Sequence, residues 1–193
     1  MQSINFTMLA PSGSGGAFLT ELLDNNWSKN NTRINDNYRC EKTNEYAGSS
    51  NIVRLEYLSS DYEFNSKSIL LGMPGAFTSV CSNKHLPSYK DNIDKIRSKG
   101  VDKVFCISVN DPYVMDAWAK ISKVENEIIM LADPFGDFAN KLGVLVNKDA
   151  KGLGMRSSRY TMIVENKVIK YVAVEKETGI CELSAADNVL SKL

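Results

Sequence analysis

Histidine is almost absent from this chain of 193 residues, and neither charge is in excess. His85 is the only histidine, and 23 basic residues balance 23 acidic ones to give a formal net charge of zero. A metal site of histidines and closely spaced cysteines is therefore not expected, and no basic excess indicates nucleic acid as a partner. We expect no metal and no other cofactor.

Long apolar runs and paired cysteines are missing as well. No apolar stretch reaches the roughly 18 residues that a membrane span needs, so no membrane partner is expected. The four cysteines, Cys40, Cys81, Cys106 and Cys181, are scattered and form no Cys-x-x-Cys pair. This pattern does not suit a disulfide-rich secreted domain and indicates a reducing compartment with mostly free thiols.

The two ends of the chain bear on its location. The N-terminus has no charged-then-apolar signal pattern and no acid or base before Glu21, which fits poorly with an arginine-rich transit peptide. We therefore expect a cytoplasmic protein. The ending Ser191-Lys192-Leu193 matches a peroxisomal address, so a peroxisomal location is the alternative for a eukaryotic source. The same residues also fit the end of an amphipathic helix.

Residues 1–50 differ in texture from the rest of the chain. A cluster of small residues at 11–16 is followed by a short helical run and then by an asparagine-rich polar stretch at 25–37. The cluster lacks the Gly-Lys-Ser/Thr of a phosphate loop and is interpreted as a turn or linker. Residues 1–50 are thus predicted to be a partly flexible N-terminal extension rather than a second domain.

Residues 51–193 show the regular alternation of a folded domain. Apolar or alternating runs predict strands at 52–58, 68–73, 101–109, 127–132, 160–164 and 168–174, and helical patterns occupy 81–98, 111–122, 137–142 and 184–193. Asp111 and Ser184 are the expected N-caps of two of these helices. Strands alternating with helices, followed by a hairpin and a last helix, predict an α/β fold with a mixed central sheet flanked by helices.

The segment from Pro74 to Cys81 carries the most specific signal in the chain. Pro74 and Gly75 end the strand predicted at 68–73, and Cys81 falls where a helix is expected to begin. A cysteine in the first turn of a helix lies among unpaired backbone N–H groups at the positive end of the helix dipole. Both features favour the thiolate over the thiol, and Thr78 brings a hydroxyl close to the sulfur.

The pattern Pro74-x-x-x-Thr78-x-x-Cys81 resembles the active-site signature of peroxiredoxins at every defining position. Further stretches at 81–87, 107–111 and 131–134 are similar to the type II, or peroxiredoxin five-like, subfamily, and the resemblance covers roughly residues 58–193. It implies a thioredoxin-like fold, a thiol-dependent peroxidase and a homodimer. The dimer contact would include the active-site loop, Trp118 and the loop before Arg159.

Peroxide reduction requires a thiolate, groups that align the two oxygens, and a positive charge. Cys81 is the candidate for the thiolate, the Thr78 hydroxyl for the hydrogen bond to peroxide, and Pro74 for shielding the sulfur. The resemblance places the active-site arginine just before the strand at 160–164, which is Arg159. Arg156 is the reserve candidate, interpreted as a surface or dimer-contact residue.

The oxidised Cys81 is a sulfenic acid that a second thiol must resolve. Cys181 is the candidate resolving cysteine, because some type II members resolve near this C-terminal turn. The surrounding sequence also fits members that are recycled by glutathione with glutaredoxin, or by thioredoxin. Cys106 lies in an apolar strand and is interpreted as a buried structural cysteine, whereas the role of Cys40 is open.

Other functions could employ the same cysteine or the same fold. His85 lies four residues after Cys81, on the same helix face, but a thiol hydrolase would also need an orienting Asn or Asp and an oxyanion hole, neither of which is recognisable. Pro87 stands where a phosphatase loop requires arginine. A peroxide sensor or redox relay would use the same residues as the enzyme and stays open. A non-catalytic binding module would not need the full set of site residues.

Overall fold

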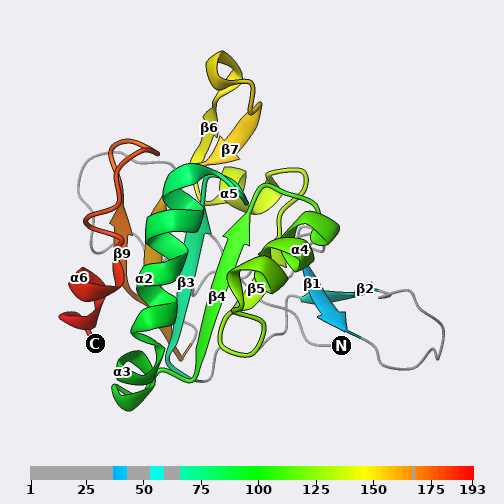
Figure 1. Cartoon of the computed structure of the whole chain (residues 1–193). Helices are drawn as coiled ribbons and strands as arrows, with labels where there is room; N and C mark the ends of the chain where they lie inside the picture. The colour runs from blue at the N-terminus through cyan, green and yellow to red at the C-terminus, as the bar shows by residue number, and fades with distance from the viewer. Residues whose placement is uncertain (1–36, 43–52, 59–65, 167) are drawn as a thin grey trace, which may run out of the picture.

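A mixed β-sheet forms the centre of the molecule in a computed structural model, which describes residues 37–42, 53–58, 66–166 and 168–193 (Figure 1). Seven of the described strands pair in the order β2-β1-β5-β4-β3-β8-β9. Their bounds are β1 Asn37–Lys42, β2 Val53–Leu58, β3 Ser68–Met73, β4 Lys103–Ser108, β5 Ile129–Ala132, β8 Tyr160–Glu165 and β9 Val168–Val174. The central β3, β4 and β5 run parallel, and β8 and β9 continue the sheet antiparallel to β3.

Helices cover both faces of this sheet. They are the π-helical turn η2 Cys81–His85 and the α-helices α2 Leu86–Asp91, α3 Ile93–Ser98, α4 Pro112–Ser122, α5 Asp137–Lys141 and α6 Ala186–Leu190. Figure 1 shows α2, α3 and α4 in front of the sheet and α5 behind it. Helices α2, α3, α4 and α6 contribute to one core cluster, and α5 contributes to the other. The sheet is therefore the middle layer of a three-layer sandwich.

Strand β3 shows why the sheet needs two covered faces. All six of its residues are buried, with Ile69 and Leu71 in the core cluster under α2 and Leu70 in the cluster under α5. A continuous apolar run is typical of a parallel strand buried on both sides. The predicted α/β architecture with a mixed sheet is thereby confirmed.

The long helix predicted at 81–98 is divided into three pieces. It begins as the π-turn η2, continues as α2 with Pro87 in its first turn, and restarts as α3 after Asn92. Asn92 has φ −108° and ψ 12°, outside helical values, so the axis changes direction there. Proline is tolerated in a first turn because no intrahelical bond needs its missing N–H.

One of the two expected helix caps is confirmed and the other is wrong. The Asp111 side chain accepts a hydrogen bond from the Val114 N–H and caps α4 as predicted. At α6, however, the N-cap position is Ala185, which supplies no side-chain bond. Ser184 instead donates its hydroxyl to Glu175, a stronger partner because the acceptor is a carboxylate.

One strand of the main sheet and a second, smaller sheet lie outside the predicted strands. Residues 37–42, counted with the N-terminal extension, form β1, which pairs with both β2 and β5 and places Cys40 opposite Leu55. The rest of that extension lies outside the described residues. A second, two-stranded sheet joins β6 Leu145–Asn147 to β7 Met155–Ser157 around the 3₁₀ turn η3 Asp149–Lys151. It projects at the top of Figure 1.

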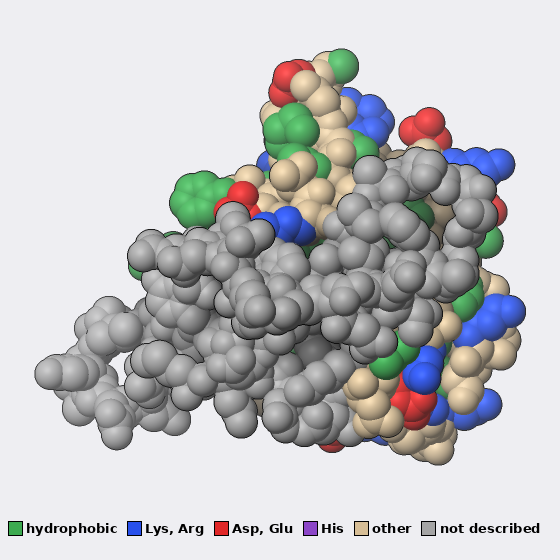
Figure 2. Space-filling model, turned by 180° about the vertical axis from the view of Figure 1, so that it is seen from behind, with side chains coloured by type: hydrophobic (Ala, Val, Ile, Leu, Met, Phe, Trp, Pro, Cys, Tyr) green, Lys and Arg blue, Asp and Glu red, His purple; other side chains and the backbone are tan. Residues whose placement is uncertain are grey.

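The surface of the described residues is mixed in charge. Acidic and basic side chains are interspersed over the described part of the face in Figure 2, in keeping with the net charge of zero. None of the described helices combines the length and the apolar character that crossing a membrane requires. At the C-terminus, α6 spans only Ala186–Leu190 of the helix predicted at 184–193, and Leu193, after the helix, is partly buried against the core.

Close packing of Tyr160 on β3 leaves no room for a side chain at Gly72. A Cβ at Gly72 would stand 1.9 Å from the Tyr160 ring. The ring is buried in the cluster under α5, and its hydroxyl has no hydrogen-bond partner among the described residues. A buried hydroxyl without a partner costs the desolvation free energy of that group.

Tyr160→Phe should therefore leave the free energy of unfolding unchanged or raise it by up to about 1 kcal/mol, because it removes the unpaired hydroxyl and keeps the ring. The matched control is Tyr89→Phe, which removes a buried hydroxyl bonded to the Ser184 carbonyl at 2.8 Å. That variant should lose about 1–2 kcal/mol. Urea unfolding of the two variants measures the difference, and a larger loss for Tyr160→Phe would contradict this assignment.

Candidate active site

Cys81 lies at the start of the helical segment that follows β3. It is fully buried and is the first residue of η2, and the Ser82 N–H donates to the Thr78 carbonyl at 2.9 Å to close the first turn. The expected place of this cysteine in the first turn of a helix is thus confirmed. The sulfur stands at the carboxyl end of a parallel strand, the edge where open α/β sheets commonly hold their sites.

The loop before Cys81 orients the hydroxyl of Thr78. The hydroxyl donates to the Gly75 carbonyl at 2.8 Å, and the Thr78 N–H donates to the same oxygen at 3.3 Å. Because the hydroxyl proton is used in this bond, the oxygen keeps lone pairs that can accept a hydrogen bond from a peroxide O–H. Pro74 is buried at the entrance to the loop.

Asn110 and Ser108, which the sequence analysis does not select for the site, hold this loop in place. The Asn110 side-chain oxygen accepts from the Ala76 N–H at 2.9 Å and from the Ser108 hydroxyl at 2.8 Å. Asn110 follows β4, so it lies at the same edge of the sheet as the loop after β3. The available signal was this position, two residues beyond an apolar parallel strand.

Arg156 braces the loop from the projecting hairpin. Its guanidinium donates to the carbonyls of Val109, at 2.9 Å, and Leu153, at 2.8 Å. The same group would stand 3.2 Å from a Cβ at Gly75. Arg156 thus joins the loop after β3, the loop after β4 and the strand β7.

Arg159 is buried and reaches the helical turn that begins with Cys81. Only 1% of Arg159 is exposed. Its Nη1 donates to His85 Nδ1 at 3.1 Å and its Nη2 donates to the Thr178 carbonyl at 2.8 Å, while its Nε has no partner among the described residues. An oriented, buried guanidinium with one N–H free is suited to bind an oxygen that gains negative charge.

Arg159 is linked to the helical turn of Cys81 through His85, which lies in the same turn η2, and Cys106 responds to both groups. Burial raises the pKa of the Cys106 thiol, negative charge on Cys81 raises it further, and the Arg159 guanidinium lowers it. Both groups therefore lie close enough to Cys106 to change its charge state. Cys106 itself is fully buried in β4, as expected of a structural cysteine.

His85 is held as a neutral ring. Its Nε2 lies 3.1 Å from the Ser184 carbonyl, which can only accept, and its Nδ1 receives an N–H of Arg159. Burial first, and then the positive charge of Arg159, lower the pKa of His85 to about 3. Since both ring nitrogens are engaged with these partners, the ring is not placed as a general base for Cys81, which argues against the hydrolase interpretation.

Cys181 is buried in the turn before α6. Only 2% of the residue is exposed, and the Ser184 hydroxyl lies 3.9 Å from its sulfur. Burial raises the pKa of the Cys181 thiol, so the protonated form dominates while the turn stays closed. The structure places Cys181 in the turn that also supplies the Thr178 carbonyl to Arg159.

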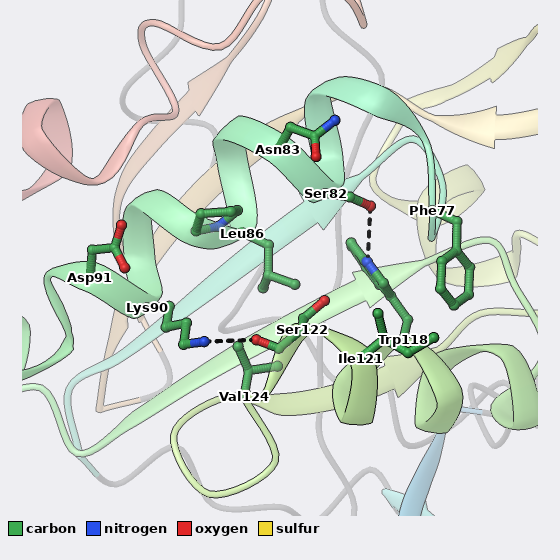
Figure 3. Close-up of a pocket in the computed structure, with 11 residues that line it drawn as sticks. Phe77, Ser82, Asn83, Leu86, Lys90, Asp91, Trp118, Ile121, Ser122 and Val124 are labelled. Atoms are coloured by element: carbon green, nitrogen blue, oxygen red, sulfur yellow. Dashed lines mark hydrogen bonds between the residues drawn. The ribbon is translucent and has the colours of Figure 1, made fainter.

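A groove runs beside the helical turn but does not include the sulfur of Cys81. It has a volume of about 300 Å³ and lies between η2, α2 and α4 (Figure 3). The Trp118 indole N–H donates to the Ser82 hydroxyl at 3.0 Å across its floor. At one end Phe77, with φ 61°, points its ring toward Trp118, and the ring centroids are 6.4 Å apart. Its lining residues are Phe77, Ser82, Asn83, Leu86, Pro87, Lys90, Asp91, Trp118, Ile121, Ser122 and Val124.

The described part of the chain contains no candidate metal site. No group of three or more His, Cys, Asp or Glu side chains lies there in a position to hold a metal ion. Cys81, Cys106 and Cys181 are free thiols.

Comparison with known proteins agrees with this geometry. The Redoxin family profile matches residues 56–190. Peroxiredoxin-2E, chloroplastic, from Arabidopsis thaliana is 43% identical over 129 residues, which are 66% of this chain and 55% of the relative. Peroxiredoxin-2F, mitochondrial, from Oryza sativa subsp. japonica is 40% identical over 133 residues, which are 69% of this chain and 67% of the relative. The chain thus spans about half of the first relative and two thirds of the second.

Solved structures show the same fold. Oxidized Prx3 from Vibrio vulnificus superposes with a TM-score of 0.66 at 34% identity, covering 81% of this chain and 93% of that one. Reduced Prx3 in complex with hydrogen peroxide, from the same organism, gives a TM-score of 0.64 at 40% identity, covering 67% and 82%. These likenesses confirm the thioredoxin-like fold. The chain therefore belongs to the Redoxin family and, within it, to the type II peroxiredoxins, which are thiol-dependent peroxidases.

Proposed function

We propose that Cys81 is the peroxidatic cysteine of a thiol-dependent peroxidase that reduces hydrogen peroxide and alkyl hydroperoxides. The Cys81 thiolate attacks one peroxide oxygen, the O–O bond breaks, and the other oxygen leaves as water or an alcohol after taking up a proton. Cys81 is oxidised to the sulfenic acid. The observation that carries this proposal is the buried guanidinium of Arg159, which bonds to His85 in the helical turn of Cys81 and keeps its Nε–H without a partner among the described residues.

The supporting roles follow from the loop geometry. Thr78 accepts from the peroxide O–H because its own proton is bonded to Gly75. Arg159 stabilises the developing charge on the oxygens, a task for which a fixed, permanently charged donor is well suited. Pro74 closes the loop over the sulfur.

Regeneration is assigned to an external thiol, either glutathione with glutaredoxin or thioredoxin. This assignment is supported by the closed state of the Cys181 turn, in which burial raises the pKa of the thiol. Resolution by Cys181 is the second candidate. It is favoured by the proximity of its turn to Arg159, through the bond to the Thr178 carbonyl.

Stopped-flow mixing of the reduced protein with hydrogen peroxide tests the peroxidatic role. Wild type should oxidise faster than free cysteine by several orders of magnitude, because thiolate formation and charge stabilisation both act on Cys81. Cys81→Ser should abolish the reaction, and Cys106→Ser should retain it. A wild-type rate no faster than that of free cysteine would refute the peroxidase proposal.

The two arginines provide a matched pair for the same measurement. Arg159→Lys should lower the rate constant by at least about tenfold, because the donors of an ammonium all lie on one nitrogen and cannot reach His85, the Thr178 carbonyl and a peroxide as the guanidinium fork does. Arg156→Lys should lower it less, since Arg156 acts on the loop rather than on the peroxide. An equal or larger loss for Arg156→Lys would move the catalytic charge to that residue.

Turnover with each reductant distinguishes enzyme from sensor and tests the resolving cysteine. We expect sustained peroxide consumption with glutathione plus glutaredoxin, or with thioredoxin, and unchanged turnover for Cys181→Ser. Peroxide-treated wild type should then show no internal disulfide by intact mass. A disulfide that is present in wild type and absent in Cys181→Ser would identify Cys181 as the resolving thiol. A protein that oxidises quickly but turns over with neither reductant would act as a sensor or relay.

We infer that the protein forms a homodimer through the end of the sheet that carries Cys81. Large apolar side chains are exposed around that end: Phe77 is 49% exposed, Tyr113 is 63% exposed and Met155 is 46% exposed. These residues come from the loop after β3, the start of α4 and the projecting hairpin. Such side chains are enriched in protein interfaces.

Sedimentation equilibrium over a range of concentrations tests the dimer. Wild type should have the mass of two chains, and Phe77→Asp should shift the equilibrium toward one chain. Aspartate tolerates the left-handed backbone at this position, so the change acts on the surface rather than on the loop. Val172→Asp, on the exposed edge strand β9, is the control that should stay dimeric. A monomeric wild type at all concentrations would contradict the inference.

The free cysteines bear on the compartment in which the protein works. We infer a reducing compartment such as the cytoplasm, supported by the three free cysteines among the described residues. In the ending Ser191-Lys192-Leu193, the first two residues are exposed and Leu193 is partly buried against the core, and a peroxisomal location stays the alternative for a eukaryotic source. The two relatives above carry names that place them in the chloroplast and the mitochondrion.

A further inference from the structure

One carboxylate oxygen organises the turn that precedes α6. Glu175 follows β9 and is buried, and its Oε1 accepts three hydrogen bonds: from the Glu182 N–H at 2.7 Å, from the Ser184 N–H at 2.9 Å and from the Ser184 hydroxyl at 2.8 Å. Hydrogen bonds to an ionised acceptor are the stronger kind. Burial alone would raise the pKa of Glu175, but these bonds and the charge of Arg159 lower it, so the carboxylate is ionised at neutral pH.

The turn fixed in this way, residues 178–184, supplies two carbonyl groups to the site. The Thr178 carbonyl accepts from Arg159 Nη2 at 2.8 Å, and the Ser184 carbonyl lies 3.1 Å from His85 Nε2. The backbone of Glu175 adds a third link, because its N–H donates to the Arg159 carbonyl at 2.9 Å. The Thr178 and Ser184 carbonyls, both from this turn, thus orient the Arg159 guanidinium and the His85 ring.

The Ser184 carbonyl decides which nitrogen of His85 carries the proton. A carbonyl only accepts, so Nε2 must be the donor, and a guanidinium only donates, so Nδ1 must be the acceptor. Both demands are met by the neutral Nε2–H tautomer alone. If the turn moved, the ring could rotate, change tautomer or take up a proton, and in the last two cases an N–H would face the Arg159 N–H.

We propose that Glu175 is a positioning residue for Arg159, acting through the turn at 178–184 and the neutral ring of His85. It touches neither Cys81 nor a peroxide. It fixes the turn, the turn fixes the tautomer and the orientation of the ring, and the ring and the Thr178 carbonyl together fix the guanidinium. The proposal rests on the role of Arg159 as the charge partner of Cys81.

A charge argument points the same way. Arg159 is a buried cation, and Glu175 is an acidic group near enough to the guanidinium to have its own pKa lowered by it. The side-chain bonds of Glu175 nevertheless go to the turn, at Glu182 and Ser184. The proposal therefore assigns its main effect to the position of the turn, and variants can separate this effect from that of the charge.

Three substitutions of Glu175 separate position from charge. Glu175→Gln keeps an acceptor oxygen at the same reach but removes the charge. Glu175→Asp keeps the charge but withdraws the oxygens by one methylene, out of reach of the turn. Glu175→Ala removes both. Glu182→Ala is the matched control, because it deletes an exposed carboxylate of the same turn while keeping the N–H that Glu175 binds.

The ring of His85 gives a readout that does not depend on peroxidase activity. It is the only histidine in the chain, so its side-chain ¹⁵N signals need no assignment strategy. In the reduced wild type we expect the Nε2–H tautomer, with no titration between pH 5 and pH 8 because the pKa of the ring is about 3. Glu182→Ala and Glu175→Gln should behave in the same way. Glu175→Asp and Glu175→Ala should show mixed tautomers or a titration in this range.

The rate of Cys81 oxidation by hydrogen peroxide, measured by stopped flow on the same samples, completes the test. Misplacing a catalytic group by about 1 Å can cost a hundredfold, so we expect Glu175→Asp and Glu175→Ala to lose on the order of tenfold to a hundredfold in the rate constant. Glu175→Gln should stay within about threefold of wild type, since it keeps the acceptor bonds. Thermal unfolding of each variant shows that the rates refer to folded protein.

The outcomes divide cleanly. A wild type that reacts no faster than free cysteine would remove the proposed function, and the ring signals would still report whether Glu175 positions His85. Normal rates and an unchanged tautomer in both Glu175→Asp and Glu175→Ala would overturn the proposal. Lower thermal stability with unchanged ring signals and rates would also overturn it, because that is the result of a purely structural role. If Glu175→Ala does not fold, Glu175→Asp against Glu175→Gln decides.

Discussion

The hydrogen bond from Arg159 to a neutral histidine is the interaction on which the site depends. A buried guanidinium has to be held by acceptors, and here they are the His85 ring and a main-chain carbonyl rather than a carboxylate in direct contact. An acidic partner in a direct ion pair would neutralise the charge that peroxide reduction requires. The neutral ring orients the cation and leaves its charge available. The last strand, the turn before α6 and the first turn after β3 are arranged to keep that ring neutral.

The architecture brings together residues that are distant in sequence but lie at one edge of the sheet. The loop after β3 holds Cys81, the loop after β4 holds Asn110, and Arg159 stands just before β8. Because β3 pairs with both β4 and β8, these three positions are neighbours in space. The hydrogen bonds of the loop come from the β4 side and the charge comes from the β8 side. Thr78 and Cys81 lie between them.

The sequence predicts much of the fold, and the features that it does not predict have physical reasons. Apolar runs such as residues 68–73 predict buried strands because each face of the sheet must be covered, and the place of Cys81 at a helix start follows from Pro74 and Gly75. The short β6–β7 hairpin has three-residue strands, too short for any periodicity. The role of Ser184 depends on a carbonyl that meets His85 across 99 positions, and main-chain groups leave no mark in the sequence. The sequence predicts Ser184 as a cap because local patterns cannot show that the Glu175 carboxylate competes for its hydroxyl.

The π-helical form of η2 has a consequence for access to the sulfur. A reductant has to reach a cysteine that is completely buried in the closed structure, so the first turn must open. π-Helical turns are rare and are frequent at functional sites. Opening η2 would break the bonds of His85 to Arg159 and to the Ser184 carbonyl, and the bond from Trp118 to Ser82. Access of a reductant to the sulfur is therefore coupled to the contacts that orient the guanidinium. The turn that shields the cysteine from thiols is also the turn that holds its charge partner in place.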